Sequence, residues 1–309
     1  MKRTRFCPAK VNLFLEVTGK RPNGYHELAT LFAKIDLGDW LNMDVTVSNK
    51  TSISLNVTGP QSARIPANSQ NLVCKAAQAF LDHYCLQAHI QLKLDKHVPT
   101  GAGLGGGSSD AAGVLLCLCD IFHKNPMDLI ELAAKLGADV PLFLYPQTFL
   151  KGEGIGERLT PLPAAENLPH LVLIYPQTPV STGKVFAQLK LPPQQEILTN
   201  LTKLDKLIDV VEGGFPVEKW GSLLFNRLEE YVLPFVPAVK ESLQILQQTN
   251  EQVGMMSGSG STVFTLVGTK RHAQELAAQL RHTEKLVFPV SFYRGPVYAN
   301  YGDKSSPHE

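Results

Sequence analysis

The segment Val98–Gly113, VPTGAGLGGGSSDAAG, constrains the fold more than any other stretch because five of its residues between positions 101 and 107 are glycine. Apolar and polar residues alternate from Ile90 to Asp95, which predicts a half-buried strand, and the apolar run Ala111–Phe122 predicts a buried helix. Glycine accepts positive φ and has no side chain, so such a loop can wrap an anion at a helix start, where free N–H groups point outward. The segment therefore predicts a strand, a phosphate-binding loop and a helix.

Other glycine-rich motifs fit this segment less well. Three of the glycines satisfy GxGxxG, but a dinucleotide-binding fold also needs a second strand that ends in an acid about 20 residues later, where this sequence is helical in pattern. A P-loop needs Gly-Lys-Ser/Thr, and a protein kinase needs HRD and DFG motifs, none of which occurs here. A loop that only connects strand and helix stays open as an alternative. Ser108, Ser109 or Asp110 is expected to cap the helix.

Length and composition indicate a soluble globular protein with two domains. The chain has 309 residues, of which 44% are hydrophobic and 18% charged. Three prolines between Thr160 and Pro169 suggest a boundary, giving domains 1–160 and 161–309. The net charge of +1 favours neither nucleic acid nor membrane as a partner, and it leaves the oligomeric state open.

The cysteines and the N-terminus indicate a cytoplasmic protein. Five cysteines are an odd number without metal-ligand spacing, which favours reduced, buried thiols. The basic residues at the start are not followed by a secretion signal, and no apolar run of 18 residues occurs.

Several polar residues stand where the chain is otherwise apolar. Lys10 and Asn12 are two apart in an expected strand, so they lie on one face, although a surface lysine at a sheet edge is an alternative. Asp139 needs a cation or a hydrogen-bond donor in its apolar surroundings, unless it only caps the turn that follows. Tyr25 and His26 follow a Pro-Asn-Gly turn. They are expected either to contact a ligand at the rim of its site or to form a partly buried pair that supports the turn.

Three ordered segments resemble the motifs of the GHMP kinases, which are small-molecule kinases that include galactokinase, homoserine kinase and mevalonate kinase. They are PAKVNLFLEV at residues 8–17, PTGAGLGGGSSDAA at 99–112 and GMMSGSGSTVF at 254–264. The resemblance covers most of the chain and is thinnest from about 192 to 221. It implies an α+β fold, with an N-terminal α/β domain that contains a left-handed crossover, a C-terminal ferredoxin-like domain on the substrate side, and an active site between them.

Within this family, NGYHEL at residues 23–28 and GADVP at 137–141 are similar to a particular branch. Its members phosphorylate a hydroxyl of a cytidyl diphosphate alcohol with ATP, in non-mevalonate isoprenoid precursor synthesis. The resemblance implies ATP and Mg²⁺, with the Mg²⁺ ligands unassigned. Two alternatives stay open: a kinase for another small alcohol, such as mevalonate or homoserine, and a catalytically inactive nucleotide-binding relative.

The resemblance also implies a role for individual residues. Lys10 and Asp139 are the expected catalytic pair, with Asp139 as the base toward the substrate hydroxyl. The expected ATP-binding residues are Pro99, Gly101, Ala102, Gly103, Leu104, Gly105, Gly106, Gly107, Ser108 and Ser109. The expected substrate-binding residues are Asn12, Tyr25, His26, Thr182 and Phe186.

Overall fold

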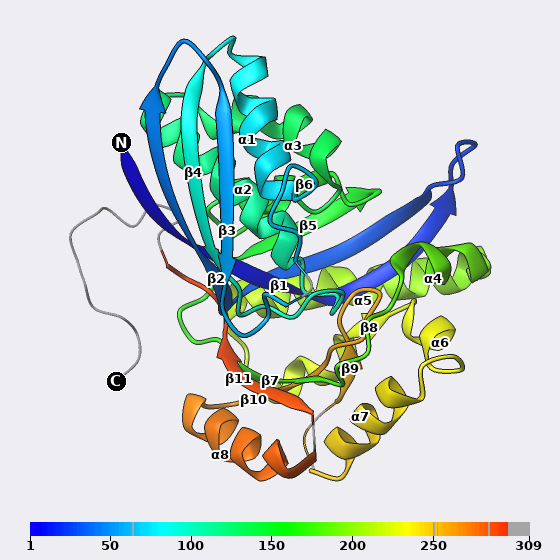
Figure 1. Ribbon diagram of the computed structural model, residues 1–309. Coiled ribbons are helices and arrows are strands. Elements are labelled where there is room, and N and C mark those ends of the chain that lie inside the picture. The colour runs from blue at the N-terminus through cyan, green and yellow to red at the C-terminus, as the bar shows by residue number, and fades with distance from the viewer. Residues whose placement is uncertain (64, 250, 252, 284, 296–309) are drawn as a thin grey trace.

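The computed structural model describes residues 1–63, 65–249, 251, 253–283 and 285–295 (Figure 1). Within these residues the strands form two sheets. The first has the order β3-β4-β2-β1-β8, with β5 paired to β2 and β6 paired to β5. Its strands are β1 (Lys2–Lys20), β2 (His26–Val47), β3 (Ser52–Thr58), β4 (Ala88–Asp95), β5 (Phe149–Gly154), β6 (Arg158–Leu162) and β8 (Phe225–Asn226).

The long strand β2 organises the first sheet. It pairs with β1 on one side, while on the other side its first half pairs with β5 and its second half with β4. The residue pattern suggests separate strands at 32–37 and 44–57, divided near Trp40. This prediction is wrong because Trp40 pairs with Phe6 of β1, their rings edge to face at 5.2 Å, and the strand continues to Val47. The interruption comes later, at residues 48–51.

Three helices and two 3-10 turns pack with this sheet. α1 and α2 pack against each other, and apolar residues of β2 and β4 complete their shared core. The sequence pattern predicts an N-cap at Asn125 and a C-cap at Gly137, and both are confirmed: Asn125 accepts from the N–H of Met127, and Gly137 ends α3. At the start of α1, Asn71 accepts from the N–H of Val73. The elements are α1 (Leu72–His83), α2 (Gly106–Phe122), η1 (Pro126–Leu129), α3 (Ile130–Leu136) and η2 (Pro141–Leu144).

Helix α2 starts earlier than the apolar pattern suggests. It begins at Gly106 within the glycine cluster, and its N-cap is Gly105, whose φ is +68°. The prediction of a serine or aspartate cap is therefore wrong. The cap position needs a left-handed backbone, and a Cβ there would lie 3.1 Å from Cγ of Lys10, so glycine fits where serine would be strained.

The second sheet has the order β11-β7-β10-β9, with antiparallel neighbours throughout. Helices separate β7 from β9 and β10 from β11, so the connection is the interleaved βαββαβ pattern of a ferredoxin-like domain, as expected. The strands are β7 (His170–Tyr175), β9 (Met255–Met256), β10 (Val263–Val267) and β11 (Leu286–Ser291). The helices and turns are α4 (Thr182–Gln188), α5 (Gln194–Gly213), η3 (Val217–Lys219), η4 (Gly221–Leu223), α6 (Glu229–Val232), α7 (Pro237–Gln247), α8 (Lys270–Leu280) and η5 (Arg281–Thr283).

The two sheets share one apolar core. Val11 and Leu31 of the first sheet belong to the same buried cluster as Leu173 and Phe264 of the second. The short strand β8, which follows α5, adds to β1 in parallel, so the second half of the chain contributes to the first sheet. The division at residue 160 stays a prediction; β6 continues to Leu162 and still pairs with β5.

The structure also bears on the cysteines and on membrane insertion. All five cysteines are free thiols, and four are buried, but Cys85 is exposed, so the prediction of buried thiols is wrong for this residue. Among the described residues, no helix combines the length and the apolar character that a membrane crossing requires.

Candidate active site

A cavity of about 890 Å³ contains nearly all the residues that the sequence singles out. Its walls come from the glycine loop, the middle of β1, the beginning of β2, the turn that carries Asp139, and α4. From the third glycine-rich segment, residues 258–260 reach the cavity. Of the expected ATP- and substrate-binding residues, only Ser109 does not line this cavity.

The glycine loop is anchored on both sides through its backbone. The N–H of Lys10 donates to the carbonyl of Leu104 at 2.9 Å, and the N–H of Thr262 donates to the carbonyl of Ala102 at 3.2 Å. A Cβ on Gly103, whose φ is +77°, would lie 2.4 Å from the Ser257 carbonyl oxygen. The loop therefore needs glycine both for its backbone conformation and for close contact with the segment that precedes β10.

The start of α2 presents unpaired donors to the cavity. The first N–H groups of a helix have no intrahelical acceptor, and here they belong to Gly106, Gly107 and Ser108. A Cβ on Gly107 would meet no atom within 4 Å, so this position faces open space. The N–H of Ser109 instead donates to the Gly105 carbonyl at 3.0 Å, and its side chain is buried. Ser109 is thus a helix residue behind the loop.

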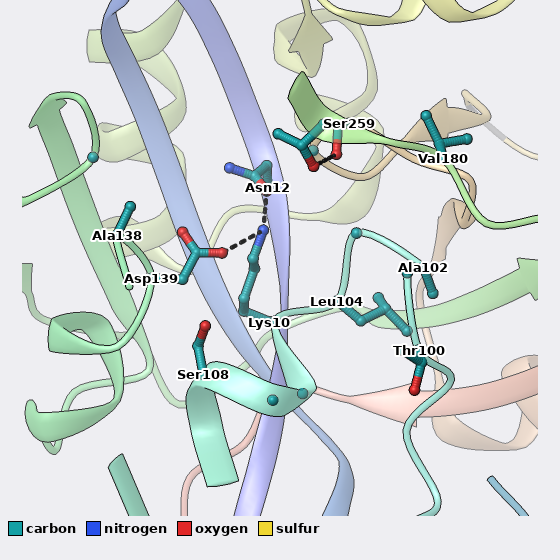
Figure 2. A pocket seen from close by; sticks show the side chains of 18 of the residues that line it. Lys10, Asn12, Thr100, Ala102, Leu104, Ser108, Ala138, Asp139, Val180 and Ser259 are labelled. Atoms are coloured by element: carbon teal, nitrogen blue, oxygen red, sulfur yellow. Dashed lines mark hydrogen bonds and ion pairs between the residues drawn. The ribbon is translucent and has the colours of Figure 1, made fainter. Parts of the chain in front are cut away.

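Lys10, Asn12 and Asp139 meet in front of this helix start (Figure 2). Nζ of Lys10 donates to Oδ1 of Asn12 at 2.8 Å and lies 3.5 Å from Oδ2 of Asp139. Lys10 is 5% exposed, whereas the Asp139 side chain is 34% exposed and reachable from the cavity. The hydroxyl of Ser108 points toward Asp139. The cation that Asp139 requires is therefore Lys10, and the carboxylate can still receive a proton from a bound alcohol.

The third glycine-rich segment closes the site from the second sheet, and its individual residues were not expected there. A Cβ on Gly258 would lie 3.1 Å from Oδ1 of Asn12 and 3.4 Å from Nζ of Lys10. The Asn226 side chain donates to the carbonyls of Met256 and Gly258, at 2.7 and 2.8 Å. Gly258 belongs to the motif GMMSGSGSTVF, so the sequence carried a signal for it. The residues around Asn226 carry no motif that marks it as part of the site.

The opposite end of the cavity is formed by side chains from two parts of the chain. Tyr25 is 59% exposed, while His26 is buried and its ring centre lies 5.4 Å from that of Phe186. Thr182 shares a hydrogen bond of 2.7 Å with the hydroxyl of Ser259. Nε2 of His26 is buried without a hydrogen-bond partner. We call Tyr25, His26, Thr182 and Phe186 the rim.

Burial fixes the protonation of the rim histidine. It lowers the pKa of His26 below its usual value, and the positive charge of Lys20 lowers this pKa further. His26 is therefore neutral at pH 7, and one ring nitrogen can donate while the other accepts.

A buried cluster of Asp39, Lys96 and Asp110 lies beneath the glycine loop, and the sequence analysis missed it. Lys96 pairs with Asp39 and, at 2.6 Å, with Asp110 of α2. The other oxygen of Asp39 accepts from the N–H of Val98 at 2.8 Å. Burial raises the pKa of Asp110 well above its usual range, although Lys96 opposes this shift. The cluster ties β2, the start of the loop and α2 together.

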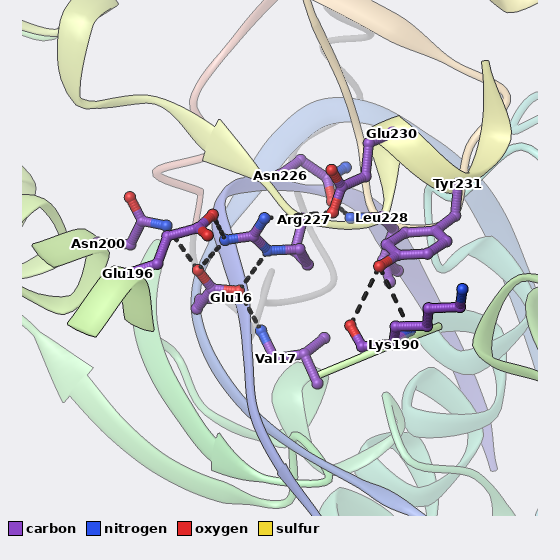
Figure 3. A network of polar contacts seen from close by, with 10 residues as sticks. All are labelled: Glu16, Val17, Lys190, Glu196, Asn200, Asn226, Arg227, Leu228, Glu230 and Tyr231. Carbon is purple, nitrogen blue, oxygen red and sulfur yellow. Dashed lines mark hydrogen bonds and ion pairs between the residues drawn. The ribbon is translucent and has the colours of Figure 1, made fainter. Parts of the chain in front are cut away.

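A second buried cluster joins β1 and α5 to Arg227, which lies between β8 and α6 (Figure 3). Arg227 donates twice to Glu16 of β1, at 2.8 Å each, and once to Glu196 of α5 at 2.6 Å. The hydrogen bonds to Glu16 raise the pKa of Arg227. Asn200 completes the set by donating to Glu16 at 2.6 Å. Because Glu16 is fully buried, Arg227 and Asn200 are necessary partners for its charge.

Two family descriptions match the chain. Residues 71–147 match the GHMP kinases N terminal domain, and residues 217–285 match the GHMP kinases C terminal domain. The chain belongs to the GHMP kinases, a family of small-molecule kinases that use ATP. The resemblance seen in its motifs is thereby confirmed.

Its curated relatives carry a more specific name. The 4-diphosphocytidyl-2-C-methyl-D-erythritol kinase of Lachnoclostridium phytofermentans is 36% identical, over 86% of this chain and 88% of the relative. The kinase of the same name from Deinococcus radiodurans is 38% identical, over 89% of this chain and 87% of the relative.

Solved structures agree on the fold. A crystal structure of 4-(cytidine 5'-diphospho)-2C-methyl-D-erythritol kinase superimposes with a TM-score of 0.74 and 32% identity, over 94% of this chain and 99% of the other. A homoserine kinase from Cytophaga hutchinsonii gives a TM-score of 0.75 with 18% identity, over 94% of this chain and 95% of the other. The second match reports the shared fold alone, because the sequences have diverged.

Proposed function

We propose that this kinase transfers the γ-phosphoryl group of ATP to a hydroxyl of 4-diphosphocytidyl-2-C-methyl-D-erythritol. The observation that carries the proposal is the contact between Lys10 and Asp139, at 3.5 Å, placed between the glycine loop and the rim of one cavity. The names of the curated relatives and of the similar crystal structure support the same substrate. The proposal places the product in non-mevalonate isoprenoid precursor synthesis.

In this proposal Asp139 orients the substrate hydroxyl and accepts its proton. A carboxylate is a weak base toward an alcohol, but in a loose transition state the bond to the hydroxyl is little advanced and the proton leaves late. Orientation then matters more than basicity. Lys10 holds the carboxylate in place and balances the charge of the transferred group, while Asn12 fixes Lys10 through the 2.8 Å hydrogen bond and faces the alcohol.

The phosphates of ATP are proposed to lie against the glycine loop and the start of α2. The free N–H groups of Gly106, Gly107 and Ser108 point into the cavity there, and the helix dipole favours negative charge. Residues Pro99 to Leu104 line the approach. Ser109 is left out of this set because its N–H is already used within the helix.

Mg²⁺ is proposed to accompany ATP and to neutralise charge on its phosphates. This ion prefers oxygen ligands and usually keeps several waters together with one or two carboxylates. The Ser108 hydroxyl and the Asp139 carboxylate are side-chain oxygens of the right kind beside the helix start. Among the described residues no group of three or more histidine, cysteine or acidic side chains is placed to hold a metal ion.

The cytidine end of the substrate is proposed to occupy the rim. Tyr25 offers an exposed ring for stacking, and the unpartnered Nε2 of His26 offers a hydrogen bond to the base edge. Phe186 and Thr182 close this end from α4.

The experiment that tests the proposal is ADP release with four candidate acceptors: 4-diphosphocytidyl-2-C-methyl-D-erythritol, mevalonate, homoserine and galactose. We expect ADP release only with the first. Turnover with only one of the other three would make the chain a kinase of another small alcohol. If ATP binds but none of the four acceptors supports turnover, the result would favour the alternative that the chain is a catalytically inactive nucleotide-binding relative.

A further inference from the structure

We propose that Thr30, near the start of β2, is a positioning residue for phosphoryl transfer. Its hydroxyl fixes the orientation of the Asn12 carboxamide, and Asn12 in turn directs the ammonium group of Lys10. The inference rests on the proposed function, since it takes Lys10 and Asn12 as parts of the reacting site. None of the sequence motifs indicates this role for Thr30.

The direction of the hydrogen bonds follows from a single fixed acceptor. The Phe14 carbonyl oxygen lies 2.6 Å from Oγ1 of Thr30, and because a carbonyl can only accept, the hydroxyl proton points to Phe14. The Thr30 oxygen must then accept from its other neighbour, the Asn12 side-chain nitrogen at 2.8 Å. That atom is therefore the NH₂ group of the carboxamide and not its oxygen.

The carboxamide oxygen is consequently left for Lys10, whose Nζ lies 2.8 Å from it. If the carboxamide were turned over, its NH₂ group would face the ammonium group of Lys10, donor against donor. Its oxygen would then face the Thr30 hydroxyl, whose proton is already used by the Phe14 carbonyl. An ammonium group has three N–H donors. One is taken by Asn12 and one points to Asp139 at 3.5 Å, which leaves one for an oxygen of the transferred phosphoryl group.

Burial makes this chain of hydrogen bonds hard to replace by water. Thr30 is 0% exposed and Asn12 is 2% exposed, although both form part of the cavity wall. A buried polar group that loses its partner carries a penalty that solvent cannot relieve. The pairing of β1 with β2 also shifts register between Asn12 and Phe14, at the point where the Phe14 carbonyl accepts from a side chain.

The test compares Thr30→Val with Thr30→Ser in the full-length enzyme. Valine has the shape of threonine without the hydroxyl, so we expect kcat to fall on the order of 10-fold, with the KM values for ATP and for the cytidyl substrate within about twofold of wild type. Serine keeps the hydroxyl and should restore most of kcat. A merely structural role would lower thermal stability and raise both KM values, and serine would not correct this.

A double-mutant cycle shows whether Thr30 acts through Asn12 or independently of it. In an Asn12→Ala background Thr30 has no carboxamide to orient, so Thr30→Val should cause little further loss of kcat. The inference is overturned if Thr30→Val alone keeps the wild-type kcat, or if it causes the same loss with and without Asn12. If Thr30→Val does not fold, Thr30→Ala and Thr30→Ser give the same comparison.

Failure of the Thr30 inference can be distinguished from failure of the proposed function. If the wild type releases no ADP with the cytidyl substrate but does so with another alcohol, the proposed function fails. The Thr30 variants are then measured with that alcohol, and the same expected loss applies because the Lys10 and Asn12 contacts do not involve the rim.

Discussion

The two ends of the cavity are constructed in different ways. The end where we propose the phosphates of ATP, called the phosphate end below, consists mainly of backbone: the glycine loop, the N–H groups that begin α2, and residues 258–260. The rim consists of side chains that come from the β1–β2 turn and from α4, far apart in the sequence. In our proposal the phosphate end works through the absence of side chains, so adding atoms there should weaken nucleotide binding. At the rim, removing atoms should cause the loss.

The largest effect is expected between the two ends, at Asp139. Asp139→Asn keeps size and hydrogen bonding but removes the charge and the basic oxygen, so kcat should fall by on the order of 100-fold or more. ATP affinity, measured by calorimetric titration, should persist, because the loop amides remain in place. Asp128→Asn, at an acid in η1 outside the cavity, serves as the control. Near-normal turnover of folded Asp139→Asn would remove Asp139 from the mechanism.

Gly107→Ala tests the phosphate end alone. A Cβ there meets no protein atom within 4 Å, so the fold tolerates it, but it occupies space where we place phosphate. We expect the dissociation constant for ATP to rise about tenfold or more with no loss of thermal stability, since alanine is the better helix former. Gly183→Ala at the rim, where a Cβ is equally free, should leave ATP binding unchanged. Unaltered ATP affinity in Gly107→Ala would mean that the loop only connects strand and helix.

How far the sequence predicts these regions depends on how local the signal is. The loop, its flanking strand and helix, and the caps at Asn125 and Gly137 could be predicted because periodicity and cap chemistry involve neighbouring residues. The start of α2 was misplaced, because close approach to Lys10 outweighs the preference of serine for a cap.

The buried polar partners could not be predicted in the same way. Lys96 meets Asp39 from 57 positions away, and Arg227 meets Glu16 from 211. Until the strands pair, a threonine at position 30 is an ordinary strand residue. Its hydrogen bonds to Asn12 and to Phe14 exist only because β1 lies beside β2 in this register.

Tyr25→Ala tests the rim by removing the aromatic ring on which we expect the cytosine base to stack. Loss of a stacking surface worth roughly 1 to 3 kcal/mol should raise the KM for the cytidyl substrate about tenfold, with the KM for ATP nearly unchanged. Tyr25→Phe keeps the ring and should behave like wild type. Because Tyr25 is 59% exposed, its truncation leaves no core cavity, so equal increases in both KM values would count against a stacking role.

The smallest effect is expected in the pH dependence of the rim. Burial, and secondarily Lys20, lowers the pKa of His26, so the neutral ring persists at neutral pH and becomes protonated only below its ordinary value of about 6.5. The KM for the cytidyl substrate should be flat from pH 7 to about 8.5 and rise on acidification, while the KM for ATP does not follow. His26→Gln, which does not titrate, should lose the acid increase. An unchanged acid profile in that variant would assign the titration to another group.

The most direct test of the account compares the cytidyl substrate with the same alcohol phosphate lacking the cytidine head. If one cavity holds the reacting hydroxyl beside Asp139 and the cytidine at the rim, kcat/KM should fall at least tenfold without the head, since both stacking and base-edge contacts are lost. Tyr25→Ala should reduce kcat/KM for the full substrate but not for the truncated one. Equal kcat/KM values for the two substrates in the wild type would contradict the assignment of the rim.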